Sequence, residues 1–74
     1  MAKATPVSFI PHVGQVAGVI WQTLTDSGPL TVTKLVKVVG EHPNTVMLAL
    51  GWLAREEKIN IDDEGRNRIV SLRQ

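Results

Sequence analysis

The spacing of apolar residues changes once along the chain, near residue 58, and this change constrains the fold more than any other feature. Before it, apolar residues recur at helical spacing in three separate segments. After it they alternate with polar residues, as in half-buried strands. With 74 residues there is room for one domain and one core. The sequence therefore predicts an α+β fold in which three helices are followed by a β-hairpin.

The three predicted helices have recognisable start and stop residues. Pro11 suits the first turn of the first helix, and the polar run 26–29 follows its end. Thr31 can cap the second helix, Gly40 can end it, and the third begins near Pro43. We expect the helical core to consist of the apolar stripes Val13, Val16, Ala17, Ile20 and Leu24, then Val32, Leu35, Val36 and Val39, then Val46, Leu50 and Leu53.

The last third of the chain predicts the hairpin. Residues 58–61 alternate polar and apolar, residues 62–65 have turn chemistry, and residues 66–72 return. The connection between the second and third helices is short, which fits two steeply crossing helices. This order of elements is that of a winged helix-turn-helix domain. We assign residues 10–74 to this domain and residues 1–9 to a flexible N-terminal arm.

Two segments resemble a known family. They are VGQVAGVIW at 13–21 and GWLAREEKI at 51–59, and they are similar to those of a prokaryotic winged helix-turn-helix family of unknown function. The likeness covers about residues 10–73. It implies the winged-helix fold and, by analogy with other winged helices, DNA binding. It implies no particular functional residue.

The composition argues against several classes of function. The absence of cysteine excludes disulfides and thiolate metal sites, and the two histidines, His12 and His42, lie far apart. We therefore expect no metal and no cofactor. No catalytic cluster or phosphate-binding glycine loop is present, so we expect no enzyme and no small-molecule substrate.

No apolar run approaches the roughly 20 residues that span a bilayer, and no signal peptide is recognisable. We expect a cytoplasmic protein without a membrane partner.

Double-stranded DNA is the first candidate partner. Residues at the start of a recognition helix contact base edges, and Asn44 suits adenine while Leu48 suits a thymine methyl group. Phosphates would be held by the start of the second helix and by basic groups on that helix and the returning strand. The candidate DNA-binding residues are Thr31, Thr33, Lys34, Asn44, Thr45, Leu48, Arg55, Arg66 and Arg68, with Lys37 nearby. The alternative is that these residues form an ordinary solvated face.

Two features argue against tight DNA binding by a single copy. The formal net charge is only +1. In addition, Asp62, Asp63 and Glu64 fall at the predicted tip of the hairpin, where they would repel phosphates unless they point away from the DNA. Helix-turn-helix proteins commonly bind as dimers. The leading hypothesis is therefore a DNA-binding regulatory protein that acts as a homodimer.

A protein partner is the second candidate. Leu48 and Trp52 lie one helical turn apart and outside the predicted core stripe, and Val19 is also an apolar residue off its stripe. These three residues are the candidate protein interface, and a homodimer would cover them. Alternatively, the N-terminal arm, with Val7, Phe9 and Ile10, covers Leu48 and Trp52. The corresponding alternative function is a protein–protein interaction module that does not bind DNA.

Gly14 and Gly18 are spaced four residues apart on the first predicted helix. Small residues at this spacing let another group approach a helix closely. We expect them to receive a bulky neighbour inside the domain, either Trp21 or Trp52.

Overall fold

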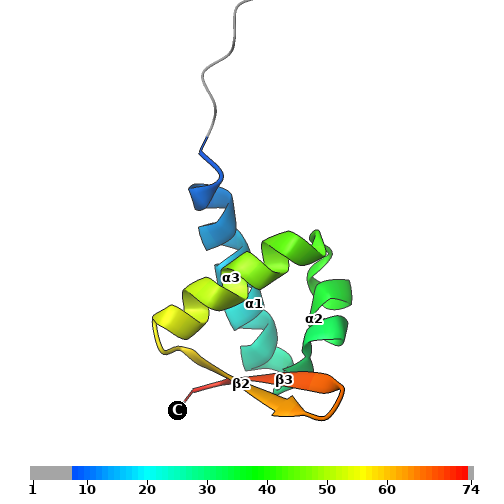
Figure 1. The fold of residues 1–74 in the computed structure, drawn as a ribbon. Helices are drawn as coiled ribbons and strands as arrows, with labels where there is room; N and C mark the ends of the chain where they lie inside the picture. Colours follow the sequence, from blue (N-terminus) through cyan, green and yellow to red (C-terminus); the bar gives the residue numbers. More distant parts are fainter. Residues whose placement is uncertain (1–7, 74) are drawn as a thin grey trace, which may run out of the picture.

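Three helices lie above a small antiparallel sheet in the computed structural model, which describes residues 8–73 (Figure 1). The elements are α1 (Ile10–Ser27), β1 (Leu30–Thr31), α2 (Val32–Val39), α3 (Pro43–Arg55), β2 (Ile59–Glu64) and β3 (Asn67–Leu72). This order confirms the predicted α+β winged helix-turn-helix fold. The predicted arm falls largely outside the described residues, so its boundary stays a prediction.

The predicted helix ends are confirmed for α2. The backbone N–H of Lys34 donates to Thr31 Oγ1 at 3.1 Å, which is the expected N-cap. Gly40 ends the helix with φ of 76°, in the left-handed region that glycine adopts without steric cost. α3 begins at Pro43 as predicted, and its N-cap is an imidazole, because the backbone N–H of Asn44 donates to His42 Nδ1 at 3.0 Å.

α1 starts at Ile10 and continues through Asp26 and Ser27, which were predicted to follow its end. At this end the polar side chains form hydrogen bonds within the helix. Gln22 Nε2 donates to Asp26 Oδ1 at 3.1 Å. Ser27 Oγ donates to the Thr23 carbonyl at 2.7 Å. These residues therefore form the last turn of α1, where a stop signal had been predicted. The helix ends at Gly28, whose φ is 82°.

The sheet has three strands in the order β1-β3-β2, whereas the sequence predicted only a two-stranded hairpin. In the added strand, Leu30 pairs with Val70 and Thr31 pairs with Ile69. Because β1 has only two residues, it shows no alternation that sequence analysis could detect. This short strand attaches the start of α2 directly to the wing, which we define as β2, β3 and the turn between them.

The turn of the wing was also placed incorrectly. β2 continues to Glu64, which pairs with Asn67, so only Gly65 and Arg66 form the turn. The acidic residues of β2 disfavour a strand by propensity. Here Asp63 lies opposite Arg68, and Arg68 Nε donates to Asp63 Oδ1 at 3.0 Å. Arg66 therefore lies in the turn rather than on the returning strand.

The core lies between α1, α3 and the helix-facing side of the sheet. All five predicted α1 residues and the predicted α3 residues Val46, Leu50 and Leu53 are buried, as predicted. The sheet contributes Ile59 and Val70. α2 is attached less firmly: Leu35 is its only fully buried residue, while its predicted core valines Val32, Val36 and Val39 are partly buried. Within the helix-turn-helix unit, α3 is thus packed extensively into the core, whereas α2 contributes a single fully buried side chain.

Of the two spaced glycines, only Gly14 receives a bulky neighbour. A Cβ at this position would lie 3.4 Å from the Trp52 ring, which confirms the predicted close packing for Gly14. A Cβ at Gly18 would meet no atom within 4 Å apart from those of its own helix and chain neighbours. Trp52 therefore packs against α1 at Gly14 and not at Gly18.

Gly18→Ala is expected to raise the free energy of unfolding by about 0.5–1 kcal/mol, because alanine loses less backbone entropy than glycine in a helix interior. The new methyl group has free space. Urea unfolding followed by circular dichroism measures the change. Gly14→Ala is the comparison, and it should gain at least as much, because its methyl group makes van der Waals contact with the Trp52 ring. A loss of stability in Gly14→Ala would contradict the packing described for Gly14.

Candidate nucleic-acid interface

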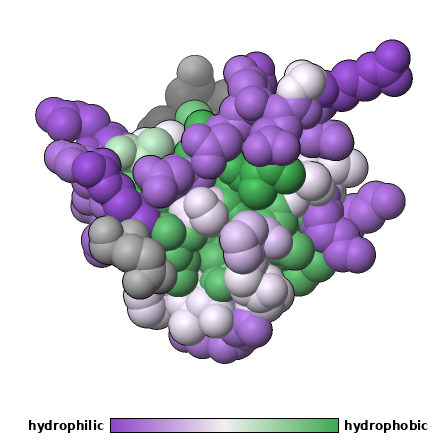
Figure 2. All heavy atoms as spheres, turned by 90° about the horizontal axis from the view of Figure 1, so that it is seen from below, coloured by the Kyte–Doolittle hydropathy of each residue, from purple (hydrophilic) through white to green (hydrophobic). Residues whose placement is uncertain are grey.

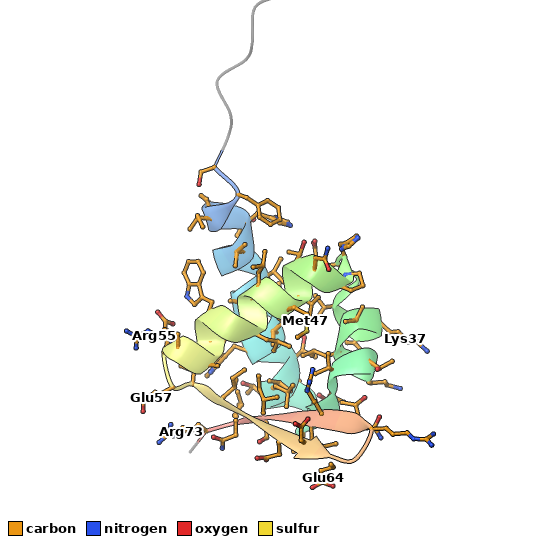
Figure 3. All side chains as sticks on the ribbon, in the orientation of Figure 1. Lys37, Met47, Arg55, Glu57, Glu64 and Arg73 are labelled. Atoms are coloured by element: carbon orange, nitrogen blue, oxygen red, sulfur yellow. The ribbon has the colours of Figure 1, made fainter. Side chains whose placement is uncertain are left out.

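α3 presents one long exposed face, with α2 on one side and the wing on another (Figures 1 and 3). Asn44, Leu48 and Arg55 lie on this face and are exposed, as their helical positions predicted. Thr45 was wrongly placed there. It is only 7% exposed, because it lies one turn before the fully buried Ala49 on the core side of α3. The Thr45 side chain therefore does not face a ligand on this surface.

A polar cleft separates the start of α2 from the wing turn. Its lining residues are Val32, Thr33, Asp63, Gly65, Arg66, Asn67 and Arg68. The structure therefore brings Thr33, Arg66 and Arg68 together, although they are distant in sequence. The pairing of Thr31 with Ile69 holds the two sides of the cleft in position. Thr31 does not line the cleft, and its hydroxyl accepts the capping hydrogen bond from the backbone N–H of Lys34.

The acidic residues of the wing do not all face the helices. Val70 is fully buried and pairs with Ile61, and two residues further along Arg68 pairs with Asp63, so these residues share the helix-facing side of the sheet. Asp62 and Glu64 alternate with them and face the other way. Glu64 lies below the sheet in Figure 3, away from α3. The third acid, Asp63, is paired with Arg68. Most of the repulsion between the wing acids and DNA phosphates that the sequence suggested is therefore absent on the side that faces α3.

The underside of the sheet is seen directly in Figure 2. Apolar side chains gather near the centre of this view, and hydrophilic side chains surround them. Ile69, which alternates with the buried Val70 and pairs with Asp62, is partly buried on this side. The acidic residues that face away from α3 thus lie on a surface that carries both apolar and hydrophilic side chains.

The lysines and arginines fall into two groups. Lys58, Arg68 and Arg73 form ion pairs with Glu56, Asp63 and Glu57. Within residues 8–73, the remaining lysines and arginines, Lys34, Lys37, Arg55 and Arg66, form no ion pair. They lie on α2, at the end of α3 and in the wing turn. Among the described residues, the positive charge that is not neutralised by a neighbour therefore lies on the helix-turn-helix unit and the wing.

A separate apolar groove lies between the start of α1 and the second half of α3. We define it by Phe9, Ile10, Val13, Leu48 and Trp52, with Arg55 and Glu56 at its rim. Phe9, Ile10 and Leu48 are 50%, 60% and 55% exposed, so the groove is open in the part of the chain that the structure describes. Val7, which was predicted to help cover it, lies outside the described residues.

The predicted protein interface is divided by the structure. Leu48 and Trp52 line the apolar groove, whereas Val19 lines a different hollow with His12, Val39 and Glu41, among others. In that hollow His12 Nε2 and Glu41 Oε1 lie 3.1 Å apart. The angular position of Val19 on its helix indicated exposure but gave no information on which residues are its neighbours.

Sequence analysis missed Met47 as a surface residue of this region. It is 43% exposed and lies beside Val32, Val36, Lys37 and Pro43 between α2 and α3. Its position on the helix, one residue after the buried Val46, would have placed it at the edge of the exposed face. The surface between the two helices is therefore more apolar than the predicted residues suggested.

Within residues 8–73, no group of three or more histidine, cysteine or acidic residues lies close enough to hold a metal ion. Over the same range, no helix is both long enough and apolar enough to cross a membrane.

The arrangement of α1, α2, α3 and the wing defines a winged helix-turn-helix protein. A family model described as a winged helix-turn-helix domain (DUF2582) matches residues 1–72, and the chain belongs to this family. The match confirms the resemblance seen in the sequence. A relative, the uncharacterized protein MJ1608 of Methanocaldococcus jannaschii, is 31% identical over 64 residues, covering 82% of this chain and 90% of the relative.

Two solved structures are similar in fold. Protein BT2368 from Bacteroides thetaiotaomicron, solved by NMR, has a TM-score of 0.78 and 28% identity, with 88% of this chain and 79% of that chain covered. The Zalpha domain of Carassius auratus PKZ, crystallised in complex with Z-DNA, has a TM-score of 0.76 and 21% identity, with 84% and 98% covered. At this identity the Zalpha domain supports the shared fold only.

Proposed function

We propose that the protein binds double-stranded DNA through the polar cleft, α2 and the exposed face of α3, and that it acts as a dimeric regulatory protein. The observation that carries the proposal is the distribution of charge. The lysines and arginines without an ion pair among residues 8–73 lie on the helix-turn-helix unit and the wing, while Asp62 and Glu64 face away from α3. Phosphate contacts dominate the affinity for DNA and require such groups.

The residues have different parts in this proposal. Thr33, Arg66 and Arg68 contact phosphates from the polar cleft, and Lys34 and Lys37 contact them from α2. On α3, Asn44 faces the major groove, whereas Leu48 and Arg55, further along the helix, belong to the dimer surface described below. Thr31 contributes by capping α2, which orients the first backbone N–H groups of that helix.

A duplex titration tests DNA binding. Fluorescence anisotropy with a labelled duplex at low salt, repeated at higher salt, should show binding that weakens as salt rises. Since the Zalpha domain with the same fold was crystallised with Z-DNA, a methylated alternating CG duplex held in the left-handed form should be titrated alongside a right-handed duplex. If neither duplex binds at low salt, the proposed DNA binding is wrong.

The proposed dimer uses the apolar groove, and its occupant is a second copy of this chain. A two-fold interface brings the same patch of both copies together, so the patch must be complementary to itself. The groove meets this requirement, since it is apolar at its centre and carries the oppositely charged Arg55 and Glu56 at its rim. In a symmetric pair, Arg55 of each copy can face Glu56 of the other.

Leu48→Glu is expected to convert the dimer to a monomer, because it places a charge in the centre of the groove without disturbing the fold: Leu48 is 55% exposed. Sedimentation velocity measures the change. Val19→Glu is the matched control, as Val19 is 49% exposed but lines another hollow, and it should remain dimeric. A wild-type protein that sediments as a monomer over the whole concentration range would refute the dimer.

The groove also favours a second candidate function, a protein-interaction module that does not bind DNA. Tryptophan is enriched among residues that dominate binding energy, and Trp52 is only partly buried in this open groove. The two functions differ in the duplex titration. Self-association that depends on Leu48, together with no binding to any duplex, would favour the interaction module.

A further inference from the structure

The exposed face of α3 has few groups that can form hydrogen bonds with bases. Its exposed residues are Pro43, Asn44, Met47, Leu48, Gly51, Ala54 and Arg55. Only Asn44 and Arg55 carry polar side chains, and Thr45 is buried. The middle of the helix therefore presents methyl groups, a thioether and bare backbone to any ligand that lies against it.

Direct readout of sequence in the major groove depends on side chains that form hydrogen bonds with base edges. Helix-turn-helix proteins use the N-terminal part of the recognition helix for this purpose. Within Pro43–Arg55, Asn44 is the one such side chain at this end, since Arg55 lies eleven residues later, roughly 16 Å along the helix axis. Met47 can contact a thymine methyl group, a contact that has no hydrogen-bonding pattern.

The groups that can contact phosphates lie elsewhere. Lys34 and Lys37 are on α2, and Arg66 is in the wing turn beside the polar cleft. Contacts from such groups position a protein on a duplex and contribute affinity, but they carry no information on the base sequence. The groups that give affinity for DNA therefore lie on α2 and in the wing turn. The few groups that could recognise a base sequence lie on α3.

We infer that this protein binds the phosphate backbone of duplex DNA with little discrimination between base sequences. The inference rests on the proposed DNA binding and specifies its ligand. The recognition helix α3 lies against the groove of the DNA without reading its bases. The basic side chains of α2 and the wing contact the DNA backbones on either side of that groove.

The test compares base sequences at constant length. Dissociation constants are measured at one low salt concentration for an A·T duplex, a G·C duplex and a mixed duplex, and a randomised duplex pool is selected over several rounds. We expect the three constants to agree within about tenfold, compared with the factor of on the order of 10³ or more that separates specific from non-specific sites. Selection should enrich no common motif.

Two variants sharpen the result. Asn44→Ala should change the affinity for all three duplexes by the same small factor. If Asn44 reads adenine, the substitution would instead weaken binding to the A·T and mixed duplexes and not to the G·C duplex. Lys37→Ala should weaken all three alike. Enrichment of one sequence motif, or a Kd for one duplex on the order of 10³-fold below the others, would overturn the inference and leave the proposed DNA binding intact. The absence of binding to every duplex would instead refute the proposed function, and this inference with it.

Discussion

Replacing Leu35 with alanine is expected to lower the free energy of unfolding by about 2–5 kcal/mol, as for other fully buried leucines. Leu35 is 0% exposed and is the only fully buried residue of α2. A chain of 74 residues has a total stability of roughly 4–11 kcal/mol at typical values per residue. The variant should therefore lose a large part of its stability, and α2 should lose its anchor to the core.

Urea unfolding followed by far-ultraviolet circular dichroism measures this effect. Val38→Ala is the matched control, because Val38 belongs to the same helix but is 52% exposed, and its change should be within about 0.5 kcal/mol. If the two variants were equally stable, α2 would not be held by Leu35. Because α2 carries Lys34 and Lys37, the Leu35→Ala protein should also bind DNA less tightly at temperatures where α2 is detached.

The double variant Lys37→Ala/Arg66→Ala is expected to weaken DNA binding about a hundredfold at low salt, since each lost phosphate contact removes on the order of tenfold under these conditions. The slope of log affinity against log salt should become shallower by about 2, one unit for each contact. Both residues are exposed and outside the core, so the fold should be retained. Anisotropy titrations at several salt concentrations measure both quantities.

A second double variant, Lys58→Ala/Arg73→Ala, controls for net charge. It removes an equal number of positive charges, but from the opposite end of the sheet, where Lys58 is paired with Glu56 and Arg73 with Glu57. Exposed ion pairs of this kind contribute little to stability. This variant should bind DNA almost as well as the wild type. Equal losses in the two double variants would show that affinity follows total charge and not the face formed by α2 and the wing.

Local rules predicted the helices well because each boundary has its own physical cause. Thr31 provides a side-chain acceptor for the first turn of α2, and Gly40 accepts the left-handed conformation that ends it. The short strand β1 could not be predicted, because two residues have no period and its pairing with β3 joins segments that are distant in sequence. The wing turn was misplaced because Asp63 is stabilised in the strand by Arg68, a partner that propensity does not consider.

The candidate site was less predictable than the fold. Helical spacing correctly predicted that Asn44 and Arg55 are exposed. Thr45 lies at the edge of the core stripe, where a small rotation of α3 about its axis decides between burial and exposure. The direction of the wing acids depends on strand register, and a shift by one residue would reverse it. Register is set by pairing across the sheet, so the sequence left open whether these acids face a DNA ligand.

The pairing of Thr31 with Ile69 has a mechanical consequence. The same residue caps α2 and belongs to the sheet, so the wing cannot swing outward without breaking the strand ladder at the base of that helix. The span between α2 and the wing turn is thus set before any duplex arrives, and little ordering entropy is lost on association. Because the spacing between α2 and the wing turn is fixed, it fits only a certain distance between the two backbones of a duplex. The affinity should therefore respond to the local geometry of the double helix, such as bending or groove compression.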